Sequence, residues 1–138
     1  MGFEKFVTGT VFRYSYLWLR EANKGETEVR KERPVTVGVR IREQDGADIL
    51  IVLPITSKMP ESGRFVSEIP EIEKRRAGLD PALRLWIILD EYNGDRIGKS
   101  YYLLDREPLG QFSKSYFLPL VREFIIRKKS IKGVDRTR

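Results

Sequence analysis

The sequence RPVTVGVRIREQDGADILIVLPIT, residues 33–56, has the clearest strand pattern in this chain. Over residues 35–41, branched apolar side chains alternate with other residues, which predicts a half-buried strand with those apolar side chains on one face. Residues 49–55 are apolar apart from Pro54, which predicts a buried strand that ends there. The Asp45-Gly46 pair between the two strands is typical of a turn. We therefore expect a hairpin.

Further short strands are expected on both sides of this hairpin. Residues 10–18 alternate, so that Phe12, Tyr14, Tyr16 and Trp18 share one face of a strand. Strands are also predicted over 65–69 and 85–89. Asn93-Gly94 predicts a second hairpin turn, which leads to a strand over 97–104. Residues 19–33 carry nine charges without a clear period and predict a long loop.

Two helices are expected. Residues 71–77 predict one or two helical turns, with Gly78 as the C-terminal cap. Residues 115–129 predict a terminal helix, with Pro119 in its first turn. Five apolar residues share one face of that helix, namely Phe117, Leu120, Val121, Phe124 and Ile125.

These elements predict a mainly β, α+β fold with a small, strongly bent antiparallel sheet or partly open barrel. No predicted helix separates successive strands, so parallel βαβ units are not expected. The length of 138 residues fits a single domain, with the barrel at about 9–126. No stretch is apolar and long enough for a transmembrane helix and no signal peptide is present, so we expect a cytoplasmic protein.

Composition excludes several kinds of chemistry. The chain has no cysteine and no histidine, which removes thiolate sites, histidine metal ligands and histidine-based nucleophilic catalysis. The net charge is +6, and most of the excess lies in residues 127–138, where six cations face one acid. This segment is either a nucleic-acid contact or a frayed, solubilising end.

Local patterns leave each candidate residue with two interpretations. Arg33 is either functional or an ordinary strand-entry arginine, and Thr56-Ser57 is either functional or a cap for turn amides. Asp90, Glu91 and Asp95 cluster near the expected turn, but their spacing does not match an EF-hand. The aromatic row over 12–18 could stack on bases, although such a row is more often core.

Three segments together are similar to the MazF/PemK family of toxins, the ribonucleases of bacterial toxin–antitoxin pairs. They are Gly9-Thr10-Val11, residues 31–37 (KERPVTV) and residues 51–57 (IVLPITS). The resemblance implies an SH3-like barrel with a terminal helix, usually dimeric. It also implies that Arg33 and Thr56 are catalytic. The chain departs from the family at residues 90–93, where a glutamine is frequent, and in its long charged loop.

The resemblance further implies a metal-independent endoribonuclease that needs no cofactor and leaves 2′,3′-cyclic phosphate and 5′-hydroxyl ends on single-stranded RNA. The 2′-hydroxyl is the nucleophile, and Arg33 binds phosphoryl oxygens; the general base is open between Glu32 and Glu91. Lys31, Ser57 and Glu91 are expected to bind substrate. An acidic antitoxin is expected at the loop 19–33, through Arg20, Lys24 and Arg30.

Two other functions remain open from the sequence. One is an SH3-like module that binds nucleic acid without cleaving it. The other is a gyrase-poisoning toxin of the related CcdB-like fold, which is expected to need an apolar, tryptophan-bearing C-terminus that residues 134–138 lack. The apolar faces of residues 11–18 and 115–126 offer more hydrophobic surface than one small barrel easily buries. This surface predicts a homodimer.

Overall fold

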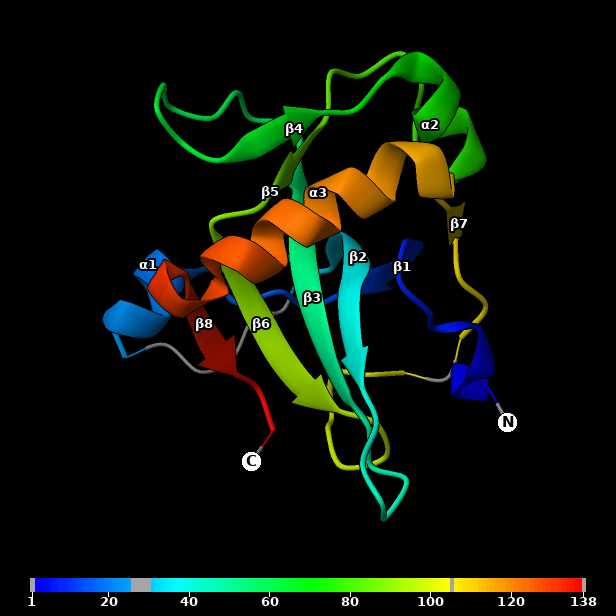
Figure 1. The fold of residues 1–138 in the computed structure, drawn as a ribbon, viewed down its shortest axis with the longest axis vertical. Helices are drawn as coiled ribbons and strands as arrows, with labels where there is room; N and C mark the ends of the chain where they lie inside the picture. The colour runs from blue at the N-terminus through cyan, green and yellow to red at the C-terminus, as the bar shows by residue number, and fades with distance from the viewer. Residues whose placement is uncertain (1, 26–30, 105, 138) are drawn as a thin grey trace.

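Two long antiparallel strands, β2 (Arg33–Ile41) and β3 (Ile49–Thr56), form the centre of the fold (Figure 1). The computed structural model describes residues 2–25, 31–104 and 106–137. Val35 lies opposite Pro54, and Ile41 lies opposite Ile49. The connecting loop turns at Gly46, whose φ of 82° is in the left-handed region that glycine adopts without strain. The predicted hairpin is therefore confirmed.

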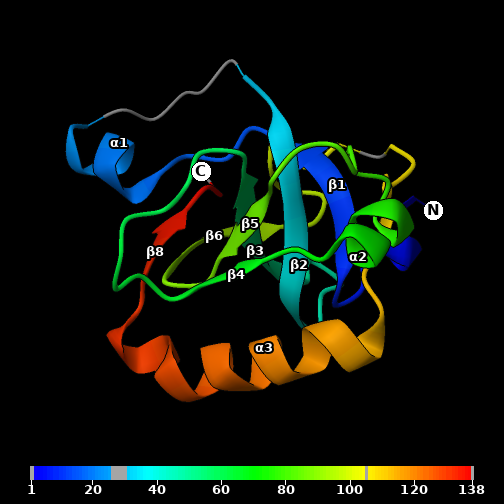
Figure 2. The same cartoon turned by 90° about the horizontal axis from the view of Figure 1, so that it is seen from above.

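The remaining strands extend this pair into one curled sheet. They are β1 (Thr10–Tyr14), β4 (Val66–Glu68), β5 (Trp86–Ile88), β6 (Glu91–Arg96), β7 (Gly110–Gln111) and β8 (Lys132–Asp135). One end of β3 pairs with β5 and the other end pairs with β6, so the sheet bends along β3 into a half-barrel. Helix α3 (Lys114–Arg127) lies along one side of the sheet (Figure 2). The expected mainly β, α+β class is confirmed.

A bulge at Gly38 changes the predicted face of the β2 side chains. Val37 lies opposite Val52 and Val39 lies opposite Ile51, so β2 has one residue more than β3 at this point. A one-residue slip moves every later side chain to the other face. Val35 and Val37 accordingly pack in one core and Val39 packs against the other, so the prediction that they share a face is wrong.

The sheet separates two hydrophobic cores. The first lies between β3 and α3 and includes Ile51, Leu53, Phe117 and Phe124. The second lies on the other face, where the aromatic row Phe12, Tyr14, Tyr16 and Trp18 packs with Val35, Val37 and Val52. All four aromatic side chains are buried. The interpretation of this row as a base-stacking surface is therefore wrong, and the row no longer supports a homodimer.

The helices differ from prediction in two places. A short helix, α1 (Leu19–Asn23), stands where a loop was expected. Helix α2 (Glu71–Arg76) is as predicted, and Gly78 follows it with a φ of 71°. In α3, Ser113 is the N-cap and accepts a hydrogen bond from the backbone N–H of Tyr116. Pro119 is the sixth residue of α3, not part of its first turn, and its ring is exposed to solvent.

Residues 91–104 also differ from prediction. Asn93-Gly94 lies inside β6 and forms no turn, and residues 97–104 form no strand. The reason is that the side chain of Asn93 points inward, where it hydrogen-bonds to the backbone of Leu17. A buried polar side chain with both of its hydrogen-bonding groups satisfied overrides the local turn preference of Asn-Gly.

The basic C-terminal segment is folded, so its interpretation as a frayed end is wrong. After the 3₁₀ turn η2 (Lys128–Ser130), β8 runs parallel to β6, with Glu91 opposite Lys132. The connection from β6 through α3 to β8 gives the parallel pair that was not expected. Arg136 is buried, with its guanidinium 3.7 Å from the centre of the Tyr102 ring. The described helices include none long and apolar enough to cross a membrane.

The first prediction tests whether this segment contributes to stability. Thr137 Oγ1 donates a hydrogen bond to Asp95 Oδ1 at 2.9 Å and accepts one from the Arg96 N–H at 2.8 Å. Thr137→Val should lower the free energy of unfolding by about 1–3 kcal/mol, since Asp95 is buried and loses a donor. Thr8→Val, at a hydroxyl with no partner among the described residues, should change it by less than about 0.5 kcal/mol. Urea unfolding measures the free energy of unfolding of both variants. Equal losses for Thr137→Val and Thr8→Val would show that the C-terminal segment does not contribute to stability through Thr137.

Candidate functional site

The two residues expected to be catalytic lie at neighbouring strand ends. Arg33 is the first residue of β2, and Thr56 is the last residue of β3. Val35 and Pro54 form the last pair of the β2–β3 ladder, and Arg33 and Thr56 each lie two residues beyond this pair. The hairpin therefore brings near each other two residues that are 23 positions apart in the sequence.

The Arg33 guanidinium is held over an aromatic ring, and no described residue forms a hydrogen bond or an ion pair with it. Its central carbon lies 5.0 Å from the centre of the Trp18 ring, and its buried Nε has no hydrogen-bond partner among the described residues. Burial lowers the pKa of Arg33; the Glu21 carboxylate opposes this shift and the Arg20 guanidinium adds to it. Arginine nevertheless stays protonated. A buried N–H without an acceptor is costly, so this site favours an anionic oxygen.

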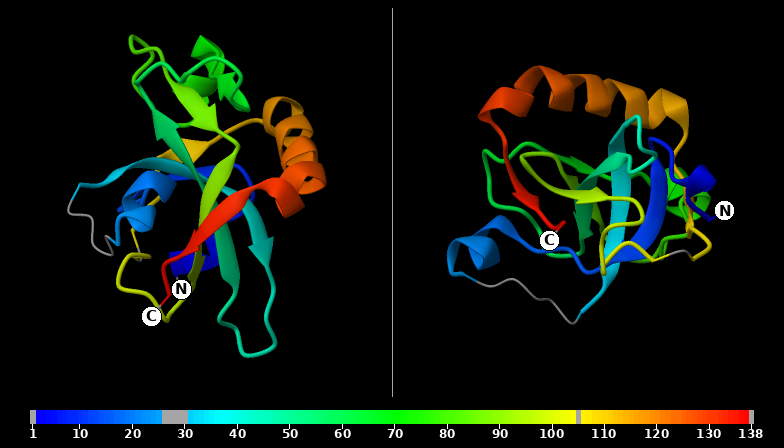
Figure 3. Two further views of the ribbon diagram at one scale, coloured as in Figure 1. Left: turned by 90° about the vertical axis from the view of Figure 1, so that its left-hand side faces the viewer. Right: turned by 90° about the horizontal axis from the view of Figure 1, so that it is seen from below.

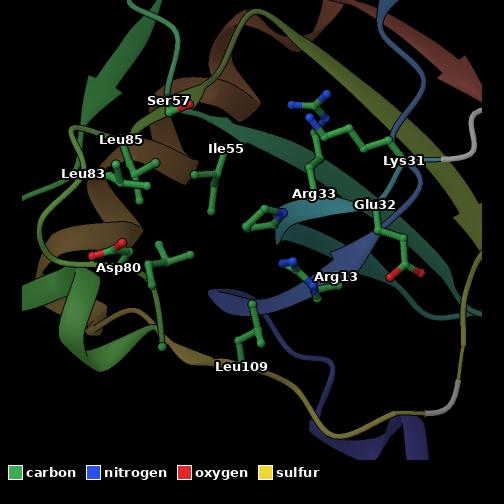
Figure 4. A pocket seen from close by; sticks show the side chains of 13 residues that line it. Arg13, Lys31, Glu32, Arg33, Ile55, Ser57, Asp80, Leu83, Leu85 and Leu109 are labelled. Carbon is green, nitrogen blue, oxygen red and sulfur yellow. The ribbon is translucent and has the colours of Figure 1, made fainter.

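Arg33 lines a pocket of about 430 Å³ with two chemically different sides. Figure 4 shows Arg33 and Lys31 on one side, opposite Leu83 and Leu85 on the other. Ser57 also lines this pocket, so two of the residues expected to bind substrate, Lys31 and Ser57, share it with Arg33. The pocket thus combines cations on one side with a mainly apolar opposite side that also includes Asp80, which suits an anion attached to an apolar group.

Thr56 lines a second, smaller pocket of about 190 Å³, together with Trp18, Arg20, Lys58 and Arg64. Its Oγ1 accepts a hydrogen bond from the Lys58 N–H at 3.1 Å, which is the turn-capping role that the sequence left open. No described residue accepts the hydroxyl hydrogen of Thr56. Thr56 can therefore cap the turn and donate a hydrogen bond to a ligand at the same time.

The position of Trp18 is set by three polar side chains of β6. Glu91, Asn93 and Asp95 alternate along the strand and are all buried. We call them the polar column. The Asn93 amide accepts from the Leu17 N–H at 2.9 Å and donates to the Leu17 carbonyl at 2.8 Å. Together the column fixes the backbone on both sides of Trp18.

The two carboxylates of the column hold the segment at its ends. Glu91 Oε1 accepts from the Leu19 N–H at 2.9 Å and from the Tyr16 hydroxyl at 3.1 Å. Asp95 Oδ2 accepts from the Tyr14 hydroxyl at 2.7 Å. Burial is the main cause that raises the pKa values of Tyr14 and Tyr16 well above their ordinary value. The neighbouring carboxylate, Asp95 for Tyr14 and Glu91 for Tyr16, raises each pKa further. Both phenols therefore stay protonated and donate.

This arrangement changes the roles expected for the acidic residues. Glu91 faces the interior and is used by the fold, so we do not retain it as a substrate-binding residue or as a general base. Asp90 accepts hydrogen bonds from the Arg64 guanidinium. Within the described residues, no group of three acidic side chains could hold a metal ion.

The remaining candidates lie around Arg33. Glu32 lines the larger pocket and forms an ion pair with Arg106 at 2.6 Å. Arg20 is exposed on α1, with its guanidinium 4.9 Å from the centre of the Trp18 ring, and Lys24 follows the end of that helix. Arg30 lies outside the described residues. The expected antitoxin site therefore includes a helix where a loop was predicted.

Comparison with known proteins adds no assignment. No protein-family model matches this chain, and a search of the curated proteins finds no match. The functional argument therefore rests on the residues and on their geometry.

Sequence reasoning missed Trp18, Arg64 and the polar column as parts of the site. The sequence predicts Trp18 only as a member of the aromatic core row. Its ring does lie in that core, but one face of the ring also supports Arg33. The polar column could have been recognised, because residues 91, 93 and 95 are polar and alternate as in a strand, but the Asn93-Gly94 pair favoured a turn at this place.

The second prediction tests the polar column. Asn93→Ala leaves the buried N–H and carbonyl of Leu17 without partners and should lower the free energy of unfolding by about 2–4 kcal/mol. Asn23→Ala removes an exposed asparagine at the end of α1 and should cost less than about 0.5 kcal/mol. Urea unfolding at neutral pH compares the two variants. A small loss for Asn93→Ala would show that the column does not hold the 14–19 segment.

Proposed function

We propose that this chain is the toxin of a type II toxin–antitoxin pair, a metal-independent endoribonuclease that cleaves single-stranded RNA. Its curled sheet and terminal helix would then be a form of the SH3-like barrel. The observation that carries the proposal is the Arg33 guanidinium, which lies half-buried over Trp18, with an Nε that has no partner among the described residues, while Thr56 lines a neighbouring pocket that Trp18 also lines. This is a prepared site for an anion with more than one oxygen.

RNA supplies the nucleophile for this chemistry. The 2′-oxygen forms a bond to phosphorus, and the bond from phosphorus to the 5′-oxygen breaks. Arg33 binds two phosphoryl oxygens and stabilises the charge that develops on them, and Thr56 donates a further hydrogen bond. The products are a 2′,3′-cyclic phosphate and a 5′-hydroxyl group.

Two proton transfers complete the reaction. The 2′-hydroxyl loses a proton to a general base, and the 5′-oxygen takes up a proton from solvent. We assign the base to the Glu32 carboxylate, which lines the pocket beside Arg33, whereas Glu91 is enclosed by the fold. The second oxygen of Glu32 accepts the proton while the first keeps its ion pair with Arg106.

A second candidate is a module that binds nucleic acid without cleaving it. The ion pair between Glu32 and Arg106 favours it, because a carboxylate engaged by a cation is a weaker base. The same basic pocket would then bind a strand only through its phosphates and one base. Binding without strand cleavage is the result that would identify this function.

The proposal includes two partners. An acidic antitoxin segment would pair with Arg20 and Lys24 on α1 and cover the pocket of Thr56, which excludes RNA. A homodimer remains a prediction from the resemblance alone. Its original physical reason is weakened, because the aromatic row is buried inside one chain and, on α3, the exposed large apolar side chains are Ile125 and Ile126 near its end.

The third prediction tests catalysis by Arg33. Arg33→Ala should reduce cleavage of a single-stranded RNA by about 10²–10³-fold, the usual cost of removing one group that stabilises a transition-state oxyanion. Thr56→Ala should reduce it less, and Thr56→Ser should retain activity. Arg122→Ala, an exposed arginine on α3, serves as the control and should cleave at the wild-type rate. Wild-type cleavage by Arg33→Ala would exclude the assignment.

The fourth prediction concerns metal. Cleavage should persist in excess EDTA, because the proposed transition state is stabilised by Arg33 and Thr56 alone. Analysis of the products by mass should find cyclic phosphate ends. Loss of activity in EDTA followed by recovery with magnesium would overturn the mechanism.

A further inference from the structure

The ion pairs of the molecule are unevenly distributed. Ten cationic side chains among the described residues pair with carboxylates within 4.0 Å, and they include Lys5 and Arg42, which line neither the Arg33 pocket nor the Thr56 pocket. Unpaired cations attract a polyanion more strongly than paired ones, because no neighbouring carboxylate cancels their field. Unpaired cations that continue from the proposed site therefore indicate where a polyanion bound at that site would extend.

Several unpaired cations belong to α1, to the loop after β3 and to the C-terminal segment, whose strand β8 contacts α1. Helix α1 lies beside β8, and both face the viewer in the left panel of Figure 3. Five side chains, which we call the cationic face, belong to α1, to the loop after β3 and to the C-terminal segment. They are Arg20, Lys24, Lys58, Lys129 and Lys132. None of the five forms an ion pair with a described carboxylate.

The strand register directs Lys132 toward α1. Residues opposite each other in neighbouring strands project to the same side of a sheet. Lys132 lies opposite Glu91, and Glu91 accepts a hydrogen bond from the Leu19 N–H at the start of α1. The exposed Lys132 ammonium therefore lies on the α1 side of β8.

The acidic side chains described on these two elements are already engaged. Glu21 on α1 accepts a hydrogen bond from the Trp18 N–H at 3.1 Å, and Asp135 on β8 accepts one from the Thr137 N–H at 3.0 Å. They are turned to the backbone of their own segments. Neither of these two acidic side chains therefore forms an ion pair with the cationic face.

The cationic face continues into the proposed active site. Arg20 and Lys58 line the same pocket as Thr56, and the Arg20 and Arg33 guanidiniums lie near one Trp18 ring. An extended polyanion that places one of its charges at Arg33 can therefore pass Arg20 and Lys58 on its way toward Lys132, although Glu61 also lines that pocket.

We propose that the cationic face binds the phosphates of a single-stranded RNA several nucleotides away from the phosphate at Arg33. The inference rests on the proposed function and adds the path that the RNA strand follows over the surface of the protein. At Lys129 and Lys132, outside the proposed antitoxin contacts Arg20 and Lys24, a nucleic-acid strand fits better than an acidic protein segment, because β8 contributes no exposed large apolar side chain and a protein partner needs apolar contacts at the centre of its interface. Phosphates need only cations.

The fifth prediction measures this binding by its salt dependence. The probe is a mixed-sequence, single-stranded 2′-deoxy 12-mer, which lacks the nucleophile and cannot be cleaved. Lys129→Ala with Lys132→Ala should reduce the slope of log K against log salt by about 1.4, since each phosphate contact on a single strand contributes about 0.7. Affinity at 0.1 M salt should fall roughly 10- to 30-fold. Binding of a tetramer, which reaches only the Arg33 site, should be unchanged.

A matched control separates a local contact from overall charge. Lys99→Ala with Lys114→Ala removes the same charge from two other exposed, unpaired lysines, one in the loop after β6 and one at the far end of α3, and should leave the slope unchanged. Circular dichroism confirms that both double variants are folded. Equal slopes for the two double variants, or a wild-type slope for the first, would overturn the proposal.

The outcomes also separate this inference from the proposed function. If the wild-type protein fails to cleave RNA but shows the expected change in slope, the cationic face stands and the ribonuclease assignment falls. If the wild-type protein cleaves RNA but the double variant keeps the wild-type slope, the ribonuclease assignment stands and the cationic face is not an RNA-binding surface. A loss of binding to an acidic peptide, with no change for the 12-mer, would assign the cationic face to a protein partner and contradict the proposal.

Discussion

Two hydrogen bonds between the Asn93 amide and the backbone of Leu17 fix the relation between the sheet and the segment that carries Trp18. The segment after β1 leaves the sheet and has no strand partner of its own, so its buried polar backbone groups need other partners. The polar column supplies them from β6, at a spacing that only a strand provides. Without the column, the Trp18 ring would have no fixed place beside β2, and Arg33 would lose the surface on which it rests.

This dependence explains why the site combines rigidity with an unsatisfied charge. Trp18 supports the guanidinium by contact with its ring face, which restrains the arginine without using any of its N–H groups. The hairpin restrains the backbone of Arg33 and Thr56 by strand pairing. Arg33 is thus held in place by neighbours that leave its donors available, which is the condition for electrostatic stabilisation without reorganisation. An ion pair in the same position would restrain the arginine equally well but would neutralise it.

The sequence predicted those parts of the fold that depend on short-range patterns. The hairpin of residues 33–56, α2 and α3 follow from apolar periodicity and from turn residues, and all three are present. The errors occur where tertiary contacts override local preference. Asn93-Gly94 has a turn composition but is drawn into β6 by Leu17, and the bulge at Gly38 redirects Val39. Residues 132–135 have no strand pattern, and they become β8 because β6 offers an unpaired edge. For the site, Arg33, Thr56, Lys31 and Ser57 were placed together by the resemblance, whereas Trp18 and the polar column could be recognised only once β6 was known to be a strand.

The span of the column's contacts bears on the order in which the molecule folds. Asn93 and Leu17 are 76 residues apart in the chain, and Asp95 and Tyr14 are 81 residues apart. Closing such long loops is entropically costly and slow, whereas a hairpin closes over a short distance. The hairpin with Arg33 and Thr56 can therefore pair early, but the ring that supports Arg33 arrives only when most of the chain is in place. A partly folded chain would hold the two side chains near each other and still lack a competent site, so the appearance of activity during refolding would report completion of the whole structure.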